Sequence, residues 1–183
     1  MVLQNIAVFL ISTLFSLYIG AVLVRFLLAY ARADFHNPLS QFLVKVTNPL
    51  LVPLRRFVPA IGKVDTASLV LAFVLKLIAV YLLSAVMGKG FNPAFLIPAA
   101  VVDLLRTLIW IYIIAMIVQA VMSWMGNAHG NPVASLLYSL TAPILQPLRK
   151  IVPTIGMVDL SPLVAILLLH VCLIALAPLP GVF

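Results

Sequence analysis

Four long runs of apolar residues divide the chain, and polar segments separate them. The runs cover about residues 2–29, 66–87, 96–125 and 162–178. A helix needs ~20 consecutive apolar residues to cross the hydrocarbon core of a bilayer. Each run therefore predicts a transmembrane helix, the fourth being the shortest. Residues 89–93 (KGFNP) predict a tight connection between the second and third spans.

The first run can also be read as a secretory signal peptide, because small residues follow it at Ala29, Ala31 and Ala33. However, no Lys or Arg precedes the run, and it is longer than the usual ~7–15-residue apolar segment of a signal peptide. The matching run at 96–125 lies in the middle of the chain, where cleavage would make no sense. We interpret both as membrane-spanning helices.

The chain repeats itself at a spacing of 94 residues. From Thr47 it reads TNPLLVPLRRFVPAIGKVD and from Thr141 TAPILQPLRKIVPTIGMVD, with 12 of the 19 aligned positions identical. A fixed-period repeat indicates two copies of one structural unit. We predict an all-α membrane protein of four transmembrane helices, arranged as two parallel helix–loop–helix repeats at residues 1–90 and 91–183.

Each repeat loop begins with a predicted amphipathic helix. Asn37-Pro38, matched by Asn131-Pro132, has the residue types of an N-cap and a first helical turn. Apolar residues then recur at helical spacing: Leu39, Phe42, Leu43 and Val46 in the first copy, and Val133, Leu136, Leu137 and Leu140 in the second. A helix of about ten residues is too short to span a bilayer, so it is expected to lie in the membrane interface or to pack on the spans.

A basic, proline-containing motif follows in each loop. Its interior prolines predict a broken segment, its Gly a turn with positive φ, and its Asp the N-cap of the next span. The motif residues are Pro49, Pro53, Arg55, Arg56, Pro59, Gly62 and Asp65 in the first copy, and Pro143, Pro147, Arg149, Lys150, Pro153, Gly156 and Asp159 in the second.

Two interpretations of the Arg55/Asp65 and Arg149/Asp159 pairs remain open. In the first, each Arg binds lipid head groups or holds its loop against its own Asp. In the second, the two basic clusters form a site for an anion or a phospholipid. About 1 kcal/mol of lipid attraction per basic residue is enough to explain juxtamembrane arginines.

Composition and charge indicate that the chain lies in a membrane and how it is oriented there. Hydrophobic residues make up 65% of the chain, charged residues 8%, and the net charge is +7. A bilayer is therefore the expected solvent, and the basic residues are expected to meet anionic head groups rather than nucleic acid. Most of the basic residues lie in the repeat loops, which predicts that the loops are cytoplasmic and that both termini lie outside. The basic residues of the loops are Arg32, Lys45, Arg55, Arg56, Lys63, Arg149 and Lys150.

Ionisable residues also occur inside the predicted spans. Lys76 and His170 are equivalent in the repeat, and Asp103 and Arg106 are three residues apart on one helix. If the third span begins near Pro93, Lys76 can reach Asp103, so that Lys76, Asp103, Arg106 and His170 form a polar path for protons or ions. Alternatively, Lys76 reaches the head groups, Arg25 and Arg106 lie at the interfaces, and His170 is a core residue.

No catalytic or cofactor signature accompanies these residues. The chain has no nucleophile elbow, P-loop, dinucleotide fingerprint or potassium-type filter. Its single cysteine, Cys172, excludes an internal disulfide. No metal set of His, Cys, Asp and Glu is evident. We expect neither enzymatic activity nor a cofactor.

The duplicated motif at residues 49–65 and 143–159 resembles that of the YggT family. The resemblance implies a small multipass protein of the bacterial inner membrane, in a family associated with osmotic-shock tolerance and potassium uptake. We expect a non-enzymatic protein that supports osmotic tolerance or organises membrane complexes, with anionic lipids and a membrane protein or further copies of itself as partners. The alternative is a component of potassium or proton transport.

Overall fold

The computed structural model describes residues 2–62, 64–88, 93–124, 130–152 and 159–179, and it folds them into six α-helices. Three of these helices, α1, α3 and α4, are long and apolar enough to cross a membrane, whereas α6 has 16 residues. The helices are α1 (Val2–Tyr30), α2 (Pro38–Arg55), α3 (Thr66–Val86), α4 (Pro93–Trp124), α5 (Pro132–Arg149) and α6 (Ser161–Leu176).

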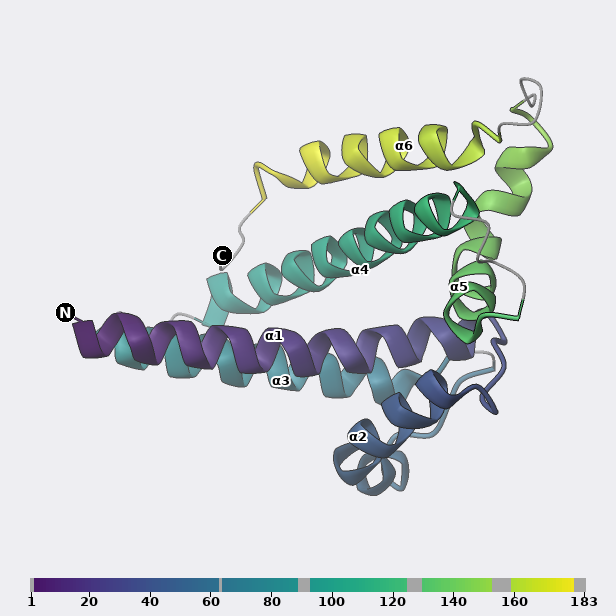
Figure 1. The fold of residues 1–183 in the computed structure, drawn as a ribbon. Coiled ribbons are helices and arrows are strands. Elements are labelled where there is room, and N and C mark those ends of the chain that lie inside the picture. The colour runs from purple at the N-terminus through teal and green to yellow at the C-terminus, as the bar shows by residue number, and fades with distance from the viewer. Residues whose placement is uncertain (1, 63, 89–92, 125–129, 153–158, 180–183) are drawn as a thin grey trace.

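The four apolar helices lie side by side, and the two remaining helices lie together at one end (Figure 1). α1 and α4 run toward the end where α2 and α5 lie, and α3 and α6 run back. The beginning of α1 and the end of α6 therefore lie at the opposite end of the bundle. The helices of both repeat loops thus lie at the same end of the bundle.

The sequence repeat is visible in the helix boundaries, because α2 and α5 begin and end at equivalent residues. Each begins with the predicted Asn N-cap. The Asn37 side chain accepts a hydrogen bond from the Leu39 N–H at 3.0 Å, and the Asn131 side chain accepts one from the Val133 N–H at 2.9 Å. The predicted helix starts are thus confirmed in both copies.

The predicted break at the motif prolines is wrong. α2 and α5 are each continuous over 18 residues, with Pro49 and Pro53 inside α2 and Pro143 and Pro147 inside α5. Each proline removes one backbone donor, and packing against the neighbouring spans, α1 for α2 and mainly α4 for α5, offsets this loss. Side chains of α1 supply hydrogen bonds close to the first proline: the Tyr18 hydroxyl donates to the Val46 carbonyl at 3.3 Å, and Arg25 donates to the Val44 carbonyl at 3.4 Å.

The turn after α2 follows the predicted chemistry more closely. Gly62 has a φ of 61°, in the left-handed region that glycine enters without penalty. Around it, Ile61 and Val64 exchange backbone hydrogen bonds of 3.1 Å in both directions. The equivalent Gly156 and Pro153 lie outside the described residues.

The two repeats are not packed equally well. α1 and α3 share a core that includes the fully buried Val22, Leu23 and Ala72. α6 contacts α4 and α5, and it leaves Leu163 and Ile174 exposed. In a bilayer, such apolar surface faces lipid or another protein.

Candidate functional site

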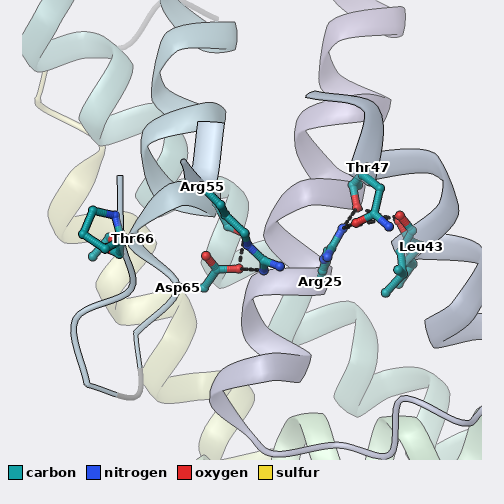
Figure 2. A network of polar contacts seen from close by, with 10 residues as sticks. Arg25, Leu43, Thr47, Arg55, Asp65 and Thr66 are labelled. Carbon is teal, nitrogen blue, oxygen red and sulfur yellow. Dashed lines mark hydrogen bonds and ion pairs between the residues drawn. The ribbon is translucent and has the colours of Figure 1, made fainter. Parts of the chain in front are cut away.

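The first repeat loop is closed by an ion pair between Arg55, the last residue of α2, and Asp65, which precedes α3 (Figure 2). The Asp65 side chain is only 10% exposed. It also accepts a hydrogen bond from the Ser68 hydroxyl at 2.8 Å, and the Thr66 hydroxyl donates to the Pro59 carbonyl at 2.5 Å. Asp65 occupies the predicted N-cap position, so one carboxylate joins the end of α2 to the start of α3.

The surroundings of Asp65 favour its charged form. Burial by itself would raise the pKa of the Asp65 carboxyl, but hydrogen bonds from Arg55 and Ser68 and the positive charge of Arg55 outweigh it, and the pKa lies below its usual value. Asp65 is therefore ionised at neutral pH, and the ion pair is fully formed.

The second loop contains the equivalent pair, in a more exposed form. Arg149 Nε lies 2.8 Å from Asp159 Oδ2, and both side chains are about one third exposed. Asp159 accepts a further hydrogen bond from the Ser161 N–H at 2.9 Å, although Leu160 occupies the N-cap position of α6. The Arg149 guanidinium also lies 5.8 Å from the centre of the Tyr138 ring. In both copies the Arg thus contacts its own Asp, as the architectural interpretation expects.

The neighbouring basic residues point outward instead. Arg56 and Lys150 form the C-caps of α2 and α5, and both are exposed. The next residues are Phe57, which is 83% exposed, and Ile151, which is 78% exposed. Each copy therefore presents one basic and one apolar side chain at the same end of the bundle. We call these four residues the loop platform.

Arg25 joins α1 to α2, whereas one of the two interpretations of the ionisable residues placed it at a membrane interface. It is 5% exposed, and its guanidinium donates to the Thr47 hydroxyl at 2.5 Å and to the Asn48 side chain at 2.8 Å (Figure 2). At the equivalent positions of the second copy, the Thr141 hydroxyl donates to Gln119 at 2.6 Å. The sequence does contain a signal for this contact. Arg25 and Gln119 occupy equivalent positions near the ends of the first and third spans, and Thr47 and Thr141 occupy equivalent positions in the loops.

Inside the bundle, a charged cluster joins α3 to α4. Lys76 Nζ of α3 lies 3.1 Å from Asp103 Oδ2 of α4, and Arg106 Nη1 lies 3.3 Å from Asp103 Oδ1. α4 begins at Pro93, and the ion pair expected across the second and third spans is confirmed. Asp103 is therefore the junction between the two repeats.

Arg106 has a second contact that sequence reasoning missed. Its Nη2 donates to the backbone carbonyls of Leu176 at 2.7 Å and Leu179 at 3.1 Å. Leu176 is the last residue of α6 and Leu179 lies three residues beyond it. The last turn of a helix leaves carbonyls without intrahelical partners, and its negative dipole end favours a cation. Arg106 thus caps α6 from α4.

His170 does not join the cluster. It is exposed, its ring meets the Trp110 ring edge-on at 5.9 Å between centroids, and its Nδ1 lies 3.2 Å from the Ile166 carbonyl. α3 packs on both α1 and α4, but α6 packs on α4 and α5. The placement of His170 as a core residue and as part of a relay with Lys76 and Asp103 is therefore wrong.

A cavity of about 610 Å³ adjoins the charged cluster. Equivalent positions of α1 and α4 form its walls, with Ser12 matched by Arg106, Thr13 by Thr107 and Ser16 by Trp110. Its lining residues are Ser12, Thr13, Ser16, Leu17, Lys76, Asp103, Arg106, Thr107 and Trp110. Among the residues that the structure describes, no group of three or more His, Cys, Asp or Glu side chains could hold a metal ion.

Comparison with known proteins supplies the family. The model of the CCB3/YggT family matches residues 4–86 and again residues 98–179. The chain is 39% identical over 168 residues to the uncharacterized protein YggT of Escherichia coli K12, covering 92% of this chain and 87% of that protein. It is 40% identical over 169 residues to an uncharacterized protein of Pseudomonas aeruginosa, covering 91% of this chain and 86% of that protein. No solved structure matches significantly. The chain belongs to the CCB3/YggT family.

Proposed function

We propose that this protein is a non-enzymatic, multipass protein of the bacterial inner membrane that assists the assembly or organisation of membrane complexes and thereby supports osmotic-stress tolerance. The observation that carries the proposal is the loop platform. Its exposed basic and apolar side chains occur twice, directly after α2 and α5, whose last residues form ion pairs with the aspartates of the same loops. A rigid, duplicated surface at one end of a membrane bundle suits a binding role.

The proposal includes a four-span arrangement with α6 as the fourth span. At a 1.5 Å rise per residue its 16 residues extend ~24 Å, which is short for a bilayer core. Local thinning of the bilayer can accommodate such a short span. The basic residues of both loops then lie in the cytoplasm and both termini in the periplasm.

The chemistry of the loop platform indicates what binds there. Arg56 and Lys150 suit the head groups of anionic lipids, and Phe57 and Ile151 can enter the membrane interface beside them. The same pairing of apolar and basic side chains suits a neighbouring membrane protein or a second copy of this chain. We propose no nucleic-acid partner.

Photo-crosslinking in cells tests this proposal. A photoreactive amino acid at Phe57 or Ile151 should give a discrete protein adduct, whereas the same group at the exposed Ile174 of α6 serves as the control. The Phe57→Ser/Ile151→Ser double variant should lose the adduct and reduce survival after osmotic shock, at an unchanged protein level. Full survival without any adduct at either position would contradict the proposal.

A second candidate function is ion or proton transport, which the charged cavity between α1, α3 and α4 favours. Four spans leave a monomer little room for a pore, so transport would involve oligomers or partners. If this candidate holds, Lys76→Leu and Asp103→Asn should abolish flux in vesicles and osmotic protection together. Retained protection by both variants, with no flux from the wild-type protein, would eliminate it.

A further inference from the structure

The two repeats meet inside the chain along an apolar contact, in which α4 of the second repeat packs against α1 and α3 of the first. Leu104, Leu108 and Ile111 of α4 lie against a core cluster that includes Leu23 of α1 and Ala72 of α3. We call these three residues of α4 the inserted row. A chain of two repeats makes this contact once, because only the second repeat has another repeat before it.

The first repeat carries its own version of the inserted row on α1. The residues 94 positions before the inserted row are Leu10, Leu14 and Leu17. Two of the three are identical to their counterparts on α4, and the third has Leu in place of Ile. All three are exposed, at 51%, 65% and 68%. α1 therefore presents on the outside of the bundle the same row of side chains that α4 packs inside it.

The second repeat exposes positions that are buried in the first. Leu23 of α1 and Val80 of α3 are fully buried, whereas their equivalents, Ile117 of α4 and Ile174 of α6, are 47% and 70% exposed. Among the helices that the structure describes, α6 makes no contact with α1, and the two lie on opposite sides of α4 (Figure 1). The two repeats thus each expose one half of the contact that joins them inside the chain.

His170 indicates that protein rather than lipid covers this surface. It is exposed near the middle of α6, and a polar side chain that faces hydrocarbon is costly. In the first repeat the equivalent residue is Lys76, whose ion pair with Asp103 crosses the contact between the repeats. The residue equivalent to Asp103 is Phe9, which is exposed on α1. If the same contact forms between two copies of the chain, the imidazole of one copy lies beside the aromatic ring of the other instead of lipid tails.

We propose that this chain associates with a second copy of itself, head to tail, through the contact that already joins its two repeats. The exposed row on α1 of one copy packs against the exposed face of α4 and α6 of the next, and His170 of that copy meets Phe9. A head-to-tail contact gives a ring when its rotation closes and an open line when it does not. α1 and α4 run in the same direction (Figure 1), so all copies keep one orientation across the membrane. This surface lies along the side of the bundle and is separate from the loop platform at its end.

Cross-linking between two differently tagged copies tests this contact. In a Cys172→Ser background, one copy carries Phe9→Cys and the other His170→Cys, and a short bismaleimide should join them in native membranes. Leu168→Cys takes the place of His170→Cys in the control, because Leu168 and its equivalent Val74 are both exposed and so face away from the contact in each repeat. The first pair should give an adduct that bears both tags, in clear excess over the control pair. No adduct from the first pair, or an equal yield from the two pairs, would overturn the proposal.

A packing variant gives an independent readout. Leu14→Trp/Leu17→Trp enlarges the exposed row on α1 and should weaken association about tenfold or more, because a closely packed contact tolerates larger side chains poorly. Single-molecule photobleaching in liposomes at low protein density measures association as the number of labelled copies in each spot. Val74→Trp/Ile78→Trp is the matched control, since it adds the same two side chains at exposed positions of α3.

Size-exclusion profiles identify any variant that fails to fold, and the cysteine pair keeps the test decisive even if the tryptophan variant is lost. Phe57→Ser/Ile151→Ser should leave the cross-link unchanged, so a failure of the loop platform and a failure of this contact are distinguishable. Single-step bleaching of the wild-type protein at every density, or an equal loss of association in both tryptophan variants, would overturn the proposal.

Discussion

Arg32 has a backbone conformation that residues with a side chain rarely adopt, with a φ of 52° directly after α1. The Ala33 N–H bonds to the Leu28 carbonyl at 2.9 Å across it, in the pattern that ends many helices with glycine. The second copy has Gly126 at the equivalent sequence position. The first copy therefore has a strained backbone at a residue that adds a positive charge to the end of the bundle where the repeat loops lie.

Arg32→Gly should raise the free energy of unfolding by about 1 kcal/mol, because glycine adopts this conformation without a steric penalty. Thermal unfolding of the detergent-solubilised protein measures the effect. Arg32→Ala is the control, since it removes the same charge but keeps the Cβ atom. Equal stability of the Gly and Ala variants would show that the backbone at Arg32 is not strained.

The two loop aspartates should differ in their contribution to stability. Asp65→Asn should cost about 1–3 kcal/mol, because it removes a charged acceptor whose side chain is 10% exposed. Asp159→Asn should cost less than about 1 kcal/mol, because its ion pair is about one third exposed. Unfolding curves for the two single variants compare the copies directly. A larger loss of stability in Asp159→Asn than in Asp65→Asn would contradict this expectation.

The lowered pKa of Asp65 also predicts a pH dependence. The folded state binds the Asp65 proton more weakly than the unfolded state, in which the pKa is about 3.9. The stabilisation is therefore fully present above that value and is lost as the pH falls through the lower folded pKa. Unfolding measured from pH 7 down to pH 3 should show a smaller loss in Asp65→Asn than in the wild type. Parallel curves would contradict this.

At the scale of elements, Arg25 attaches α2 to α1 by contacts with Thr47 and Asn48. The second copy attaches α5 to α4 with the uncharged pair of Gln119 and Thr141. An amide can thus take the place of the guanidinium. The joint between the span and the loop helix depends on hydrogen bonding to the threonine rather than on charge.

Arg25→Gln should therefore retain most of the stability, whereas Arg25→Met should lose about 1–3 kcal/mol, since it leaves buried polar groups without a partner. A cysteine placed on the buried face of α2 would report detachment of the helix through faster labelling in the Met variant. Equal losses in the Gln and Met variants would show that the charge of Arg25 is essential.

The elements were largely predictable from sequence, because apolar periodicity, Asn N-caps and Gly62 act locally. The extent of α2 and α5 was not predictable, since the prolines indicate a break and only packing on the spanning helices, α1 for α2 and mainly α4 for α5, outweighs it. The Lys76–Asp103 pair could be predicted from the sequence, because the two residues lie at similar depths in the second and third spans if the third begins near Pro93. The caps that Arg106 provides for α6, and the outward position of His170, depend on where α6 packs. No local pattern encodes that position.

At the scale of the whole molecule, the duplication gives two loop helices at one end of the bundle and a cavity between equivalent positions of α1 and α4. The two copies are most similar in sequence where residues cap helices and form turns. They diverge inside the bundle, where Lys76 meets Asp103 but His170 meets Trp110. A shared scaffold thus carries one symmetric surface and one asymmetric interior.

The central claim is that both repeats have the same orientation in the membrane, with the loop platform on the cytoplasmic face. In a Cys172→Ser background, single cysteines replacing Arg56 and Lys150 test it with a membrane-impermeant thiol reagent, and Val2→Cys marks the opposite side. Arg56→Cys and Lys150→Cys should label only in inverted vesicles, and Val2→Cys only in intact cells. Labelling of Arg56→Cys and Lys150→Cys from opposite sides would contradict the account.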